Sequence, residues 1–293
     1  MNTQRAELFY KSDLILGEGA IWHPQRKQFL YVDIEGKKLG SIDPVTKFCE
    51  EIPLDRRIGT VVPAANGNLV VALQGSIEEL HSGSGELRKL SDIEKNLAEN
   101  RCNDGKCDAS GRFWVGTMHL ESKPNAGALY CYQGKLQKKI GGVSISNGIC
   151  WSPDNSIMYY IDSAEYNIKA YDFDLPSGNI SNERIIAEIK EPGCMPDGMT
   201  IDEEGNLWVA IWGGCCVHQY NARTGELMGK ITVDAPNVTS CSFGGADYRQ
   251  LFITTARTGL NKKELEQHPL SGSLFMARTG IRGVPPNYFK EII

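Results

Sequence analysis

The chain has 293 residues, with 36 acidic side chains against 31 Lys and Arg, and its formal net charge is −5. No Lys- or Arg-rich run is present, so the electrostatic footprint of a nucleic-acid-binding protein is absent. No stretch approaches the roughly 20 apolar residues of a membrane span, and the N-terminus has no apolar segment of signal-peptide length. We therefore expect a soluble cytoplasmic protein without nucleic-acid or membrane partners, either a monomer or a weak homo-oligomer.

The cysteines do not form a disulfide framework. There are nine of them, an odd number, and Cys215 and Cys216 are neighbours. A disulfide scaffold is typical of short secreted chains rather than of a chain this long. We predict reduced, structural thiols.

Short β-strands and turns rich in Asp, Asn and Gly fill the chain from its first residues onward. A β-prone stretch, AELFY, covers residues 6–10, and helical periodicity is weak except around residues 260–267. Between these two stretches, six segments share one pattern, in which a turn rich in Asp, Asn and Gly is followed by a β-prone run. They are IWHPQRKQFLYVDI from Ile21, AANGNLVVAL from Ala64, NDGKCDASGRFWVGTM from Asn103, CWSPDNSIMYYIDS from Cys150, PDGMTIDEEGNLWVAIW from Pro196, and GADYRQLFITTA from Gly245.

Two pairs of these segments align at a constant shift in residue number. Setting Asp108 on Asp202 also sets Trp114 on Trp208, at a shift of 94. A second pair of segments overlays at a shift of 129, which pairs Trp22 with Trp151 and Asp33 with Asp162. The chain is therefore built from one repeated unit.

Six all-β units of about 40 to 50 residues are typical of a β-propeller, in which blades of four strands surround a channel. Two stacked sandwiches or a barrel are the alternative, but neither needs a constant register. We predict an all-β, six-bladed propeller that forms a single domain over residues 1–293. The AELFY stretch would supply the outer strand of the last blade, which both termini would then close.

Counting back from each aligned turn gives one equivalent position in every unit. In a propeller the first strand of each blade lines the channel, so these residues should form a ring of facing side chains. The ring positions, separated by 41, 44, 44, 50 and 43 residues, are Glu18, Gly59, Asn103, Asn147, Asp197 and Ser240. Five of the six carry a side-chain oxygen.

A turn is the simplest interpretation of several ring positions, because Asn147-Gly148 is a strong hairpin signal and Asn and Asp favour turns. Glu18 does not fit this interpretation, since Gly17 and Gly19 flank it and can make the turn themselves. Carboxylate and amide oxygens in phase favour a hard divalent cation such as Ca²⁺, and Mg²⁺, Mn²⁺ or Zn²⁺ would also fit. No histidine or cysteine occupies the ring, which is evidence against a closed structural zinc site.

The sequence motifs of serine hydrolases, zinc metalloproteases and P-loop nucleotide-binding proteins are absent from the chain. The chain has no G-x-S-x-G, H-E-x-x-H or G-x-x-x-x-G-K-[ST] sequence. Its histidines are scattered and none lies in the ring; they are His23, His81, His119, His218 and His268. An open metal site at the channel mouth is the main remaining candidate.

These residues resemble the senescence marker protein/regucalcin and gluconolactonase family of six-bladed propellers over nearly the whole chain. The motifs that carry the resemblance are GEGAIW, NRCNDGKCDASGRFWVGTM, GALY, ISNGICWSPD, YYIDS, PDGMTID, LWVA, TGE and SCSFGG. The resemblance implies a metal-dependent hydrolase of sugar lactones, active in sugar catabolism, with one divalent cation. Its implied metal ligands are Glu18, Asn147 and Asp197.

The resemblance also implies roles around this metal. Asn103 would contact substrate or a metal-bound water, and Arg101 and Glu121 would bind substrate hydroxyls. Asp197 is the family's candidate general base, although a carboxylate on a divalent cation is a weakened base. Many members read GESP where this chain has GEGA, which changes the turn after Glu18. The segment ESKPNAG, which begins at Glu121, is short beside the animal regucalcins, so the lid over the pocket is expected to differ and the substrate assignment stays open.

Three other functions stay open at this stage. A propeller can be a non-enzymatic scaffold, because a fold does not fix a function. The chain can also be a calcium-binding regulator, as the regucalcin name suggests. A paraoxonase-like esterase is the third alternative and would have a more apolar pocket, whereas Arg101 and Glu121 together favour a polyol.

Overall fold

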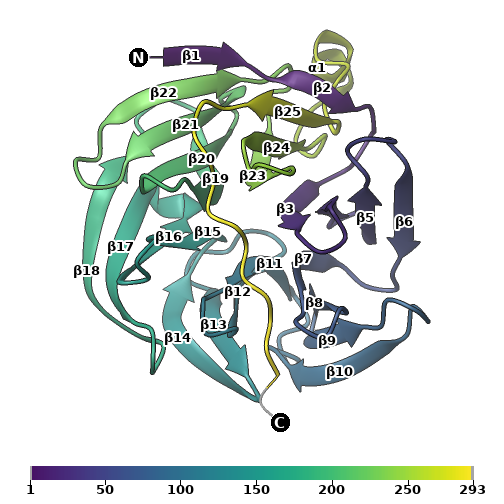
Figure 1. Cartoon of the computed structure of the whole chain (residues 1–293), viewed down its shortest axis with the longest axis vertical. Helices are drawn as coiled ribbons and strands as arrows, with labels where there is room; N and C mark the ends of the chain where they lie inside the picture. The colour runs from purple at the N-terminus through teal and green to yellow at the C-terminus, as the bar shows by residue number, and fades with distance from the viewer. Residues whose placement is uncertain (1, 292–293) are drawn as a thin grey trace.

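The computed structural model describes residues 2–291 and shows six sheets set around a channel (Figure 1). This arrangement confirms the predicted six-bladed propeller. Each sheet starts at the channel and runs outward in chain order. The first three are β3 (Gly17–His23), β4 (Gln28–Asp33), β5 (Lys38–Ile42) and β6 (Cys49–Pro53); β7 (Ile58–Pro63), β8 (Leu69–Leu73), β9 (Ser76–Leu80) and β10 (Leu87–Asp92); and β11 (Asn100–Cys107), β12 (Phe113–His119), β13 (Gly127–Gln133) and β14 (Lys135–Val143).

The other three sheets follow the same order and include the N-terminal strands. They are β15 (Ser146–Trp151), β16 (Ile157–Asp162), β17 (Asn167–Asp174) and β18 (Asn179–Glu188); β19 (Met195–Ile201), β20 (Asn206–Trp212), β21 (Cys216–Asn221) and β22 (Leu227–Thr232); and β23 (Val238–Gly244), β24 (Gln250–Thr255) and β25 (Leu274–Arg278). We number the blades 1 to 6 in this order.

Both N-terminal strands lie on the outside of late blades. Strand β2 (Glu7–Tyr10) pairs antiparallel with β25 and is the outer strand of blade 6. Strand β1 (Asn2–Arg5) pairs parallel with β22 and makes blade 5 five-stranded. This second pairing was not predicted, because a parallel edge strand leaves no turn signal in the sequence. Through these pairings the start of the chain holds blades 5 and 6 together.

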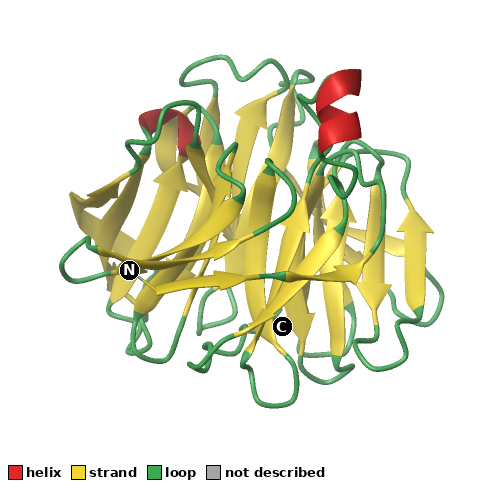
Figure 2. Ribbon diagram, turned by 90° about the horizontal axis from the view of Figure 1, so that it is seen from above, coloured by secondary structure: helices red, strands yellow, loops and turns green. Residues whose placement is uncertain are grey.

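Helices are short and lie at one end of the propeller (Figure 2). The predicted helical stretch contains α1 (Lys262–Gln267), whose N-cap Asn261 exchanges hydrogen bonds with Glu264 in a capping box. A single 3-10 turn, η1 (Ser163–Glu165), follows β16. Within residues 2–291, no helix has the length and apolar character of a membrane span.

The repeated aspartates hold the turns of their blades. Asp202 accepts hydrogen bonds from the backbone N–H groups of Glu204 and Asn206, and from Trp208 Nε1 at 2.9 Å. Asp108 likewise accepts from Trp114 Nε1 at 2.8 Å. The constant shift of 94 therefore has a physical origin: a buried carboxylate satisfies the turn and fixes the tryptophan six residues later.

The repeated tryptophans pack against the next blade. Trp22 of blade 1 stacks on Phe252 of blade 6, with ring centroids 5.7 Å apart. Trp114 of blade 3 meets Trp151 of blade 4 edge to face, at 5.9 Å. Because these rings are buried between sheets, the repeat that shapes each blade also joins it to its neighbour.

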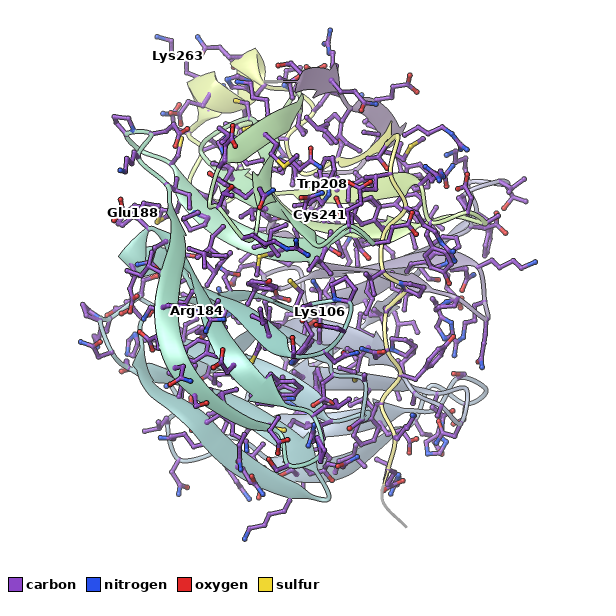
Figure 3. The ribbon with its side chains drawn as sticks, turned by 60° about the vertical axis from the view of Figure 1, so that its left-hand side comes forward. Lys106, Arg184, Glu188, Trp208, Cys241 and Lys263 are labelled. Carbon is purple, nitrogen blue, oxygen red and sulfur yellow. The ribbon has the colours of Figure 1, made fainter. Side chains whose placement is uncertain are left out.

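Side chains change from mostly buried on the inner strands, such as β20, to mostly exposed on the outer strands, such as β18. Figure 3 shows Trp208 and Cys241 inside, and Arg184 and Glu188 on the outer strand β18. Cys241 is fully buried. All nine cysteines are free, which confirms the prediction of reduced thiols.

The C-terminal segment crosses one end of the channel rather than joining a blade (Figure 1). The N–H of Val284 donates to Ile201 O, that of Phe289 to Pro63 O and that of Lys290 to Gly111 O. The Phe289 ring is buried and stacks on Tyr132. Residues 279–291 thus cover the end of the channel at which the inner strands finish, and the opposite end stays free for a site.

We expect Asp108→Ala to destabilise the protein by about 3–5 kcal/mol, because it leaves the buried Arg112 guanidinium without the carboxylate 2.6 Å away. Trp114 Nε1 loses its acceptor as well. Urea unfolding would measure the change. The exposed Glu203→Ala serves as the control, with an expected change within about 0.5 kcal/mol. Equal stabilities of the two variants would contradict a structural role for Asp108.

Candidate active site at the channel mouth

A β-bulge occurs in every inner strand at or beside the ring position. In each blade the inner strand carries one more residue than its partner between two consecutive pairs. These intervals are Glu18/Ile21, Ile58/Thr60, Cys102/Gly105, Ser146/Ile149, Pro196/Met199 and Val238/Ser240. A bulge bends its strand and re-aims a side chain, so six bulges at one level explain why side chains gather there.

Asn147 lies inside strand β15, so Asn147-Gly148 is not a hairpin turn. The two residues fall in the bulge, between the pairs of Ser146 and Ile149. A Cβ added to Gly148 would lie 2.6 Å from Met199 Cβ and 2.8 Å from Asp197 O, so only glycine allows this approach of blades 4 and 5. Glycine is needed here for interblade packing and not for chain reversal.

The bulges surround a cavity of about 280 Å³. Five predicted site residues line it: Glu18, Arg101, Asn103, Asn147 and Asp197. Gly59 and Ser240 of the ring are not among the lining residues. Ser240 instead packs against Gly198, where an added Cβ would lie 2.6 Å from Ser240 Oγ. The structure thus brings together four of the five oxygen-bearing ring side chains.

Glu121 is not part of the cavity lining in this structure. Its side chain is 74% exposed and lies 3.5 Å from Lys123 Nζ, although its neighbours Leu120 and Ser122 line the cavity. The short loop carries the carboxylate outward, toward a lysine rather than toward the pocket. Its role in binding substrate stays a prediction.

Two carboxylates on the cavity floor repel each other. Burial, with the Asp104 carboxylate nearby, raises the pKa of Glu18 to about 8. Burial, with the charges of Glu18 and Asp104, also raises the pKa of Asp197 well above its ordinary value. Arg101 opposes both shifts but does not cancel them. The floor is therefore short of positive charge.

An unpartnered oxygen of Asp197 shows the same deficit of positive charge. Asp197 Oδ1 is buried and has no hydrogen-bond partner in the described structure, and neither has Asp104 Oδ2, which lies outside the cavity lining. Asp202, in a turn of the same blade as Asp197, has both oxygens hydrogen-bonded. A buried acceptor without a partner is costly, so the Asp197 oxygen fits a cation better than it fits an empty apolar surface.

Glu18, Asn147 and Asp197 together could hold a hard divalent cation, because all three carry side-chain oxygens and line one cavity. Within residues 2–291, no group of three His, Cys, Asp or Glu side chains could do so. A cation at this floor therefore depends on the amide oxygen of Asn147 as its third protein ligand.

Several lining residues were missed by the sequence analysis. Glu35 lines the cavity and pairs with Arg57 Nε at 2.9 Å. Its negative charge also favours the charged form of Arg101. Ser163 and Trp212 line it as well. All three come from loops or strand ends beyond the ring register. A clue existed only for Ser163, which follows the repeated Asp162.

Comparison with known proteins places the chain in a family. The family described as "SMP-30/Gluconolactonase/LRE-like region" matches residues 16–257. The chain belongs to the SMP-30/gluconolactonase/LRE-like family. Regucalcin of Oryctolagus cuniculus is 35% identical over 98% of both chains.

Solved structures agree with this assignment. A calcium-binding protein, regucalcin, from Agrobacterium tumefaciens superposes with a TM-score of 0.95 over 99% of both chains, at 23% identity, which establishes the shared fold. A luciferin-regenerating enzyme superposes with a TM-score of 0.90 at 29% identity, over 97% of this chain and 99% of that one. The resemblance noted from the motifs is thereby confirmed.

We expect Glu18→Gln to stabilise the chelator-treated protein, and increasingly so as the pH rises from about 4.5 to 8. The folded protein keeps the Glu18 proton up to about pH 8, whereas the unfolded chain releases it near 4.5. Folding stability therefore falls across this window, by at most about 1.4 kcal/mol per pH unit for one group. The glutamine side chain of the variant has no proton to lose.

Urea unfolding in chelator at pH 5, 6, 7 and 8 would measure this difference between the two proteins. Asp197 stays in both proteins and is still buried near Asp104, although in the variant it loses the Glu18 charge that raises its pKa, so the slope should shrink without vanishing. Identical pH slopes for wild type and variant would contradict the raised pKa of Glu18.

Proposed function

We propose that this protein is a metal-dependent lactonase, which hydrolyses a sugar lactone to its aldonic acid in sugar catabolism. The observation that carries the proposal is the buried, unpartnered Asp197 Oδ1 beside Glu18 and the Asn147 amide, on the floor of one open cavity. A propeller that acts only as a scaffold would not need two buried carboxylates, such as Glu18 and Asp197, at one cavity. The gluconolactonase branch of the family supports a lactone as substrate.

Glu18, Asn147 and Asp197 would hold the cation, which is Ca²⁺, Zn²⁺, Mg²⁺ or Mn²⁺. When bound, such a cation stabilises the negative charge that develops on a carbonyl oxygen during ester hydrolysis. The calcium-binding description of the Agrobacterium tumefaciens protein supports a divalent ion and favours Ca²⁺.

Asp197 would act as the general base. The Asp197 carboxylate would take a proton from the attacking water, whose oxygen forms a bond to the lactone carbonyl carbon. The ring C–O bond then breaks, and the leaving alkoxide takes up the proton, so a hydroxy acid results. Burial favours the protonated form of Asp197, which offsets the weakening of this base by a cation.

Arg101 and Asn103 would bind the substrate beside this floor. Both side chains are buried and line the cavity, and Arg101 Nη1 donates to Asn103 Oδ1. The other guanidinium donors of Arg101 remain for substrate oxygens. Glu35 adds an acceptor on the same side. One wall of the cavity is thus suited to hydroxyl groups.

We expect chelation to abolish hydrolysis of δ-gluconolactone, and one of the four divalent ions to restore it. Asp197→Asn should lower kcat by about 10²–10⁴-fold while keeping the fold, because Asn resembles the protonated acid that burial already favours. A pH-stat assay would measure the rate, and circular dichroism would check the fold. Near wild-type turnover of a folded Asp197→Asn protein would overturn the assignment of the base.

A second candidate function is hydrolysis of a less polar lactone or ester, and one observation favours it. The remaining cavity walls are mostly apolar, formed by Leu16, Met118, Leu120, Ile145, Met195 and Trp212. A fully hydroxylated ring would leave hydroxyls without partners on this side. The luciferin-regenerating enzyme shows that the fold also serves proteins named for other chemistry.

Matched substitutions on the two walls separate these candidates. Trp212→Ala should lower kcat/KM for an alkyl-substituted δ-lactone by about 10-fold or more and affect δ-gluconolactone less. Arg101→Met should show the reverse. If neither lactone is hydrolysed with any cation while the cations still bind, a calcium-binding or scaffold function replaces the enzymatic one.

A further inference from the structure

A chain of hydrogen bonds runs through the floor of the site and crosses three blades. Arg101 Nη1 donates to Asn103 Oδ1, and Asn103 Nδ2 donates to Asn147 Oδ1 at 3.0 Å. Asn147 Nδ2 then donates to Ser163 Oγ at 2.8 Å. Finally, Ser163 Oγ donates to Pro196 O at 2.6 Å, in the residue directly before Asp197.

The direction of this chain is fixed at both ends. A guanidinium only donates hydrogen bonds, and a backbone carbonyl only accepts them. Neither Asn103 nor Asn147 can therefore turn its amide over without placing two donors or two acceptors face to face. Asn103 Nδ2 also donates to Ser146 O at 2.7 Å, which holds its orientation a second time.

Asn147 is held on both sides of its amide: Asn103 Nδ2 donates to its Oδ1, and its own Nδ2 donates to Ser163 Oγ. Ser163 is the partner on the nitrogen side. The Ser163 side chain is 2% exposed, and its hydroxyl is the acceptor of the Asn147 amide N–H. This hydroxyl can accept from Asn147 only while its own proton points to Pro196 O. With the nitrogen held in this way, Oδ1 faces Asn103 and keeps one lone pair free.

We infer that Ser163 is a positioning residue, which holds the Asn147 amide with its oxygen toward the cation floor and ties it to the strand that carries Asp197. This inference rests on the proposed cation site and deepens it. Ser163 lines the cavity but acts through Asn147 and the Pro196 carbonyl. Groups that orient a metal ligand in this way typically contribute 10- to 100-fold to affinity.

The test measures cation binding and not catalysis alone. Chelator-stripped protein is titrated with CaCl₂ and with MnCl₂ by calorimetry. Ser163→Ala should bind the ion that wild type binds about 10- to 100-fold more weakly. Ser163→Thr, which keeps the hydroxyl, should restore most of the affinity. For a lactone that wild type hydrolyses, Ser163→Ala should regain activity as the cation concentration is raised to saturation.

Ser273→Ala is the matched control. Ser273 is also fully buried and its Oγ donates to a backbone carbonyl, Ser12 O, at 3.1 Å, but it does not line the cavity. Both Ala variants should lose comparable stability in chelator, while only Ser163→Ala loses cation affinity. Should Ser163→Ala fail to fold, Ser163→Cys, a weaker acceptor, should give an intermediate affinity.

One outcome would overturn the positioning role of Ser163 alone, and another would overturn the proposed cation site as well. If Ser163→Ala binds the cation within about threefold of wild type, or if, where that variant does not fold, Ser163→Cys binds as tightly as wild type, the positioning role is wrong and the proposed site stands. If wild type binds neither ion nor Mg²⁺ nor Zn²⁺, the proposed cation site itself is wrong, and the positioning role fails with it.

Discussion

The burial of two carboxylates, Glu18 and Asp197, at one cavity is the constraint around which the site is arranged. Burial raises the pKa of each, and the charge of Asp104 adds to both shifts. Arg101 lowers the pKa of both carboxyl groups without cancelling the shifts. Its guanidinium is itself buried and donates a hydrogen bond to Asn103. A folded chain retains such an arrangement only because neighbouring groups hold it in place, as is common at functional sites.

The propeller supplies the rigidity that this arrangement needs. Interblade tryptophans, the pairing of the N-terminal strands with blades 5 and 6, and the C-terminal segment across the far end all restrict movement of the blades. The bulges then direct one side chain from each of four blades into the same cavity. Gly148, which has no side chain, lets the bulged strands of blades 4 and 5 lie close together.

Two kinds of buried acid can be distinguished in this fold. Asp108 and Asp202 accept hydrogen bonds from turn N–H groups and an indole, and they recur because every copy of the turn needs them. Asp197 and Asp104 each retain an oxygen without any partner. Of the second kind, Asp197 lines the cavity and Asp104 does not, and the difference between the two kinds lies in hydrogen-bond satisfaction and not in residue type or burial.

The cavity itself has two unlike walls. Arg101, Asn103 and Glu35 make one side polar, whereas Met195 and Trp212 belong to an apolar side. Glu121 lies outside, at a short loop. The residues of the proposed cation site are therefore more closely determined than the walls that would contact the rest of a substrate.

Sequence alone predicted the six-bladed fold and four ring residues that meet at one cavity, because a repeated unit imposes the same strand register in every blade. The repeat could not show that Ser240 turns toward Gly198, that Glu121 points outward, or that Glu35 and Trp212 reach the cavity. Those outcomes depend on loop paths and on contacts between blades. Likewise, the sequence showed Asn147 as a turn or a ligand, and only the tertiary structure decided its orientation. The reason is physical: an amide is oriented by its partners, and the partners of Asn147 come from two other elements, β11 and η1.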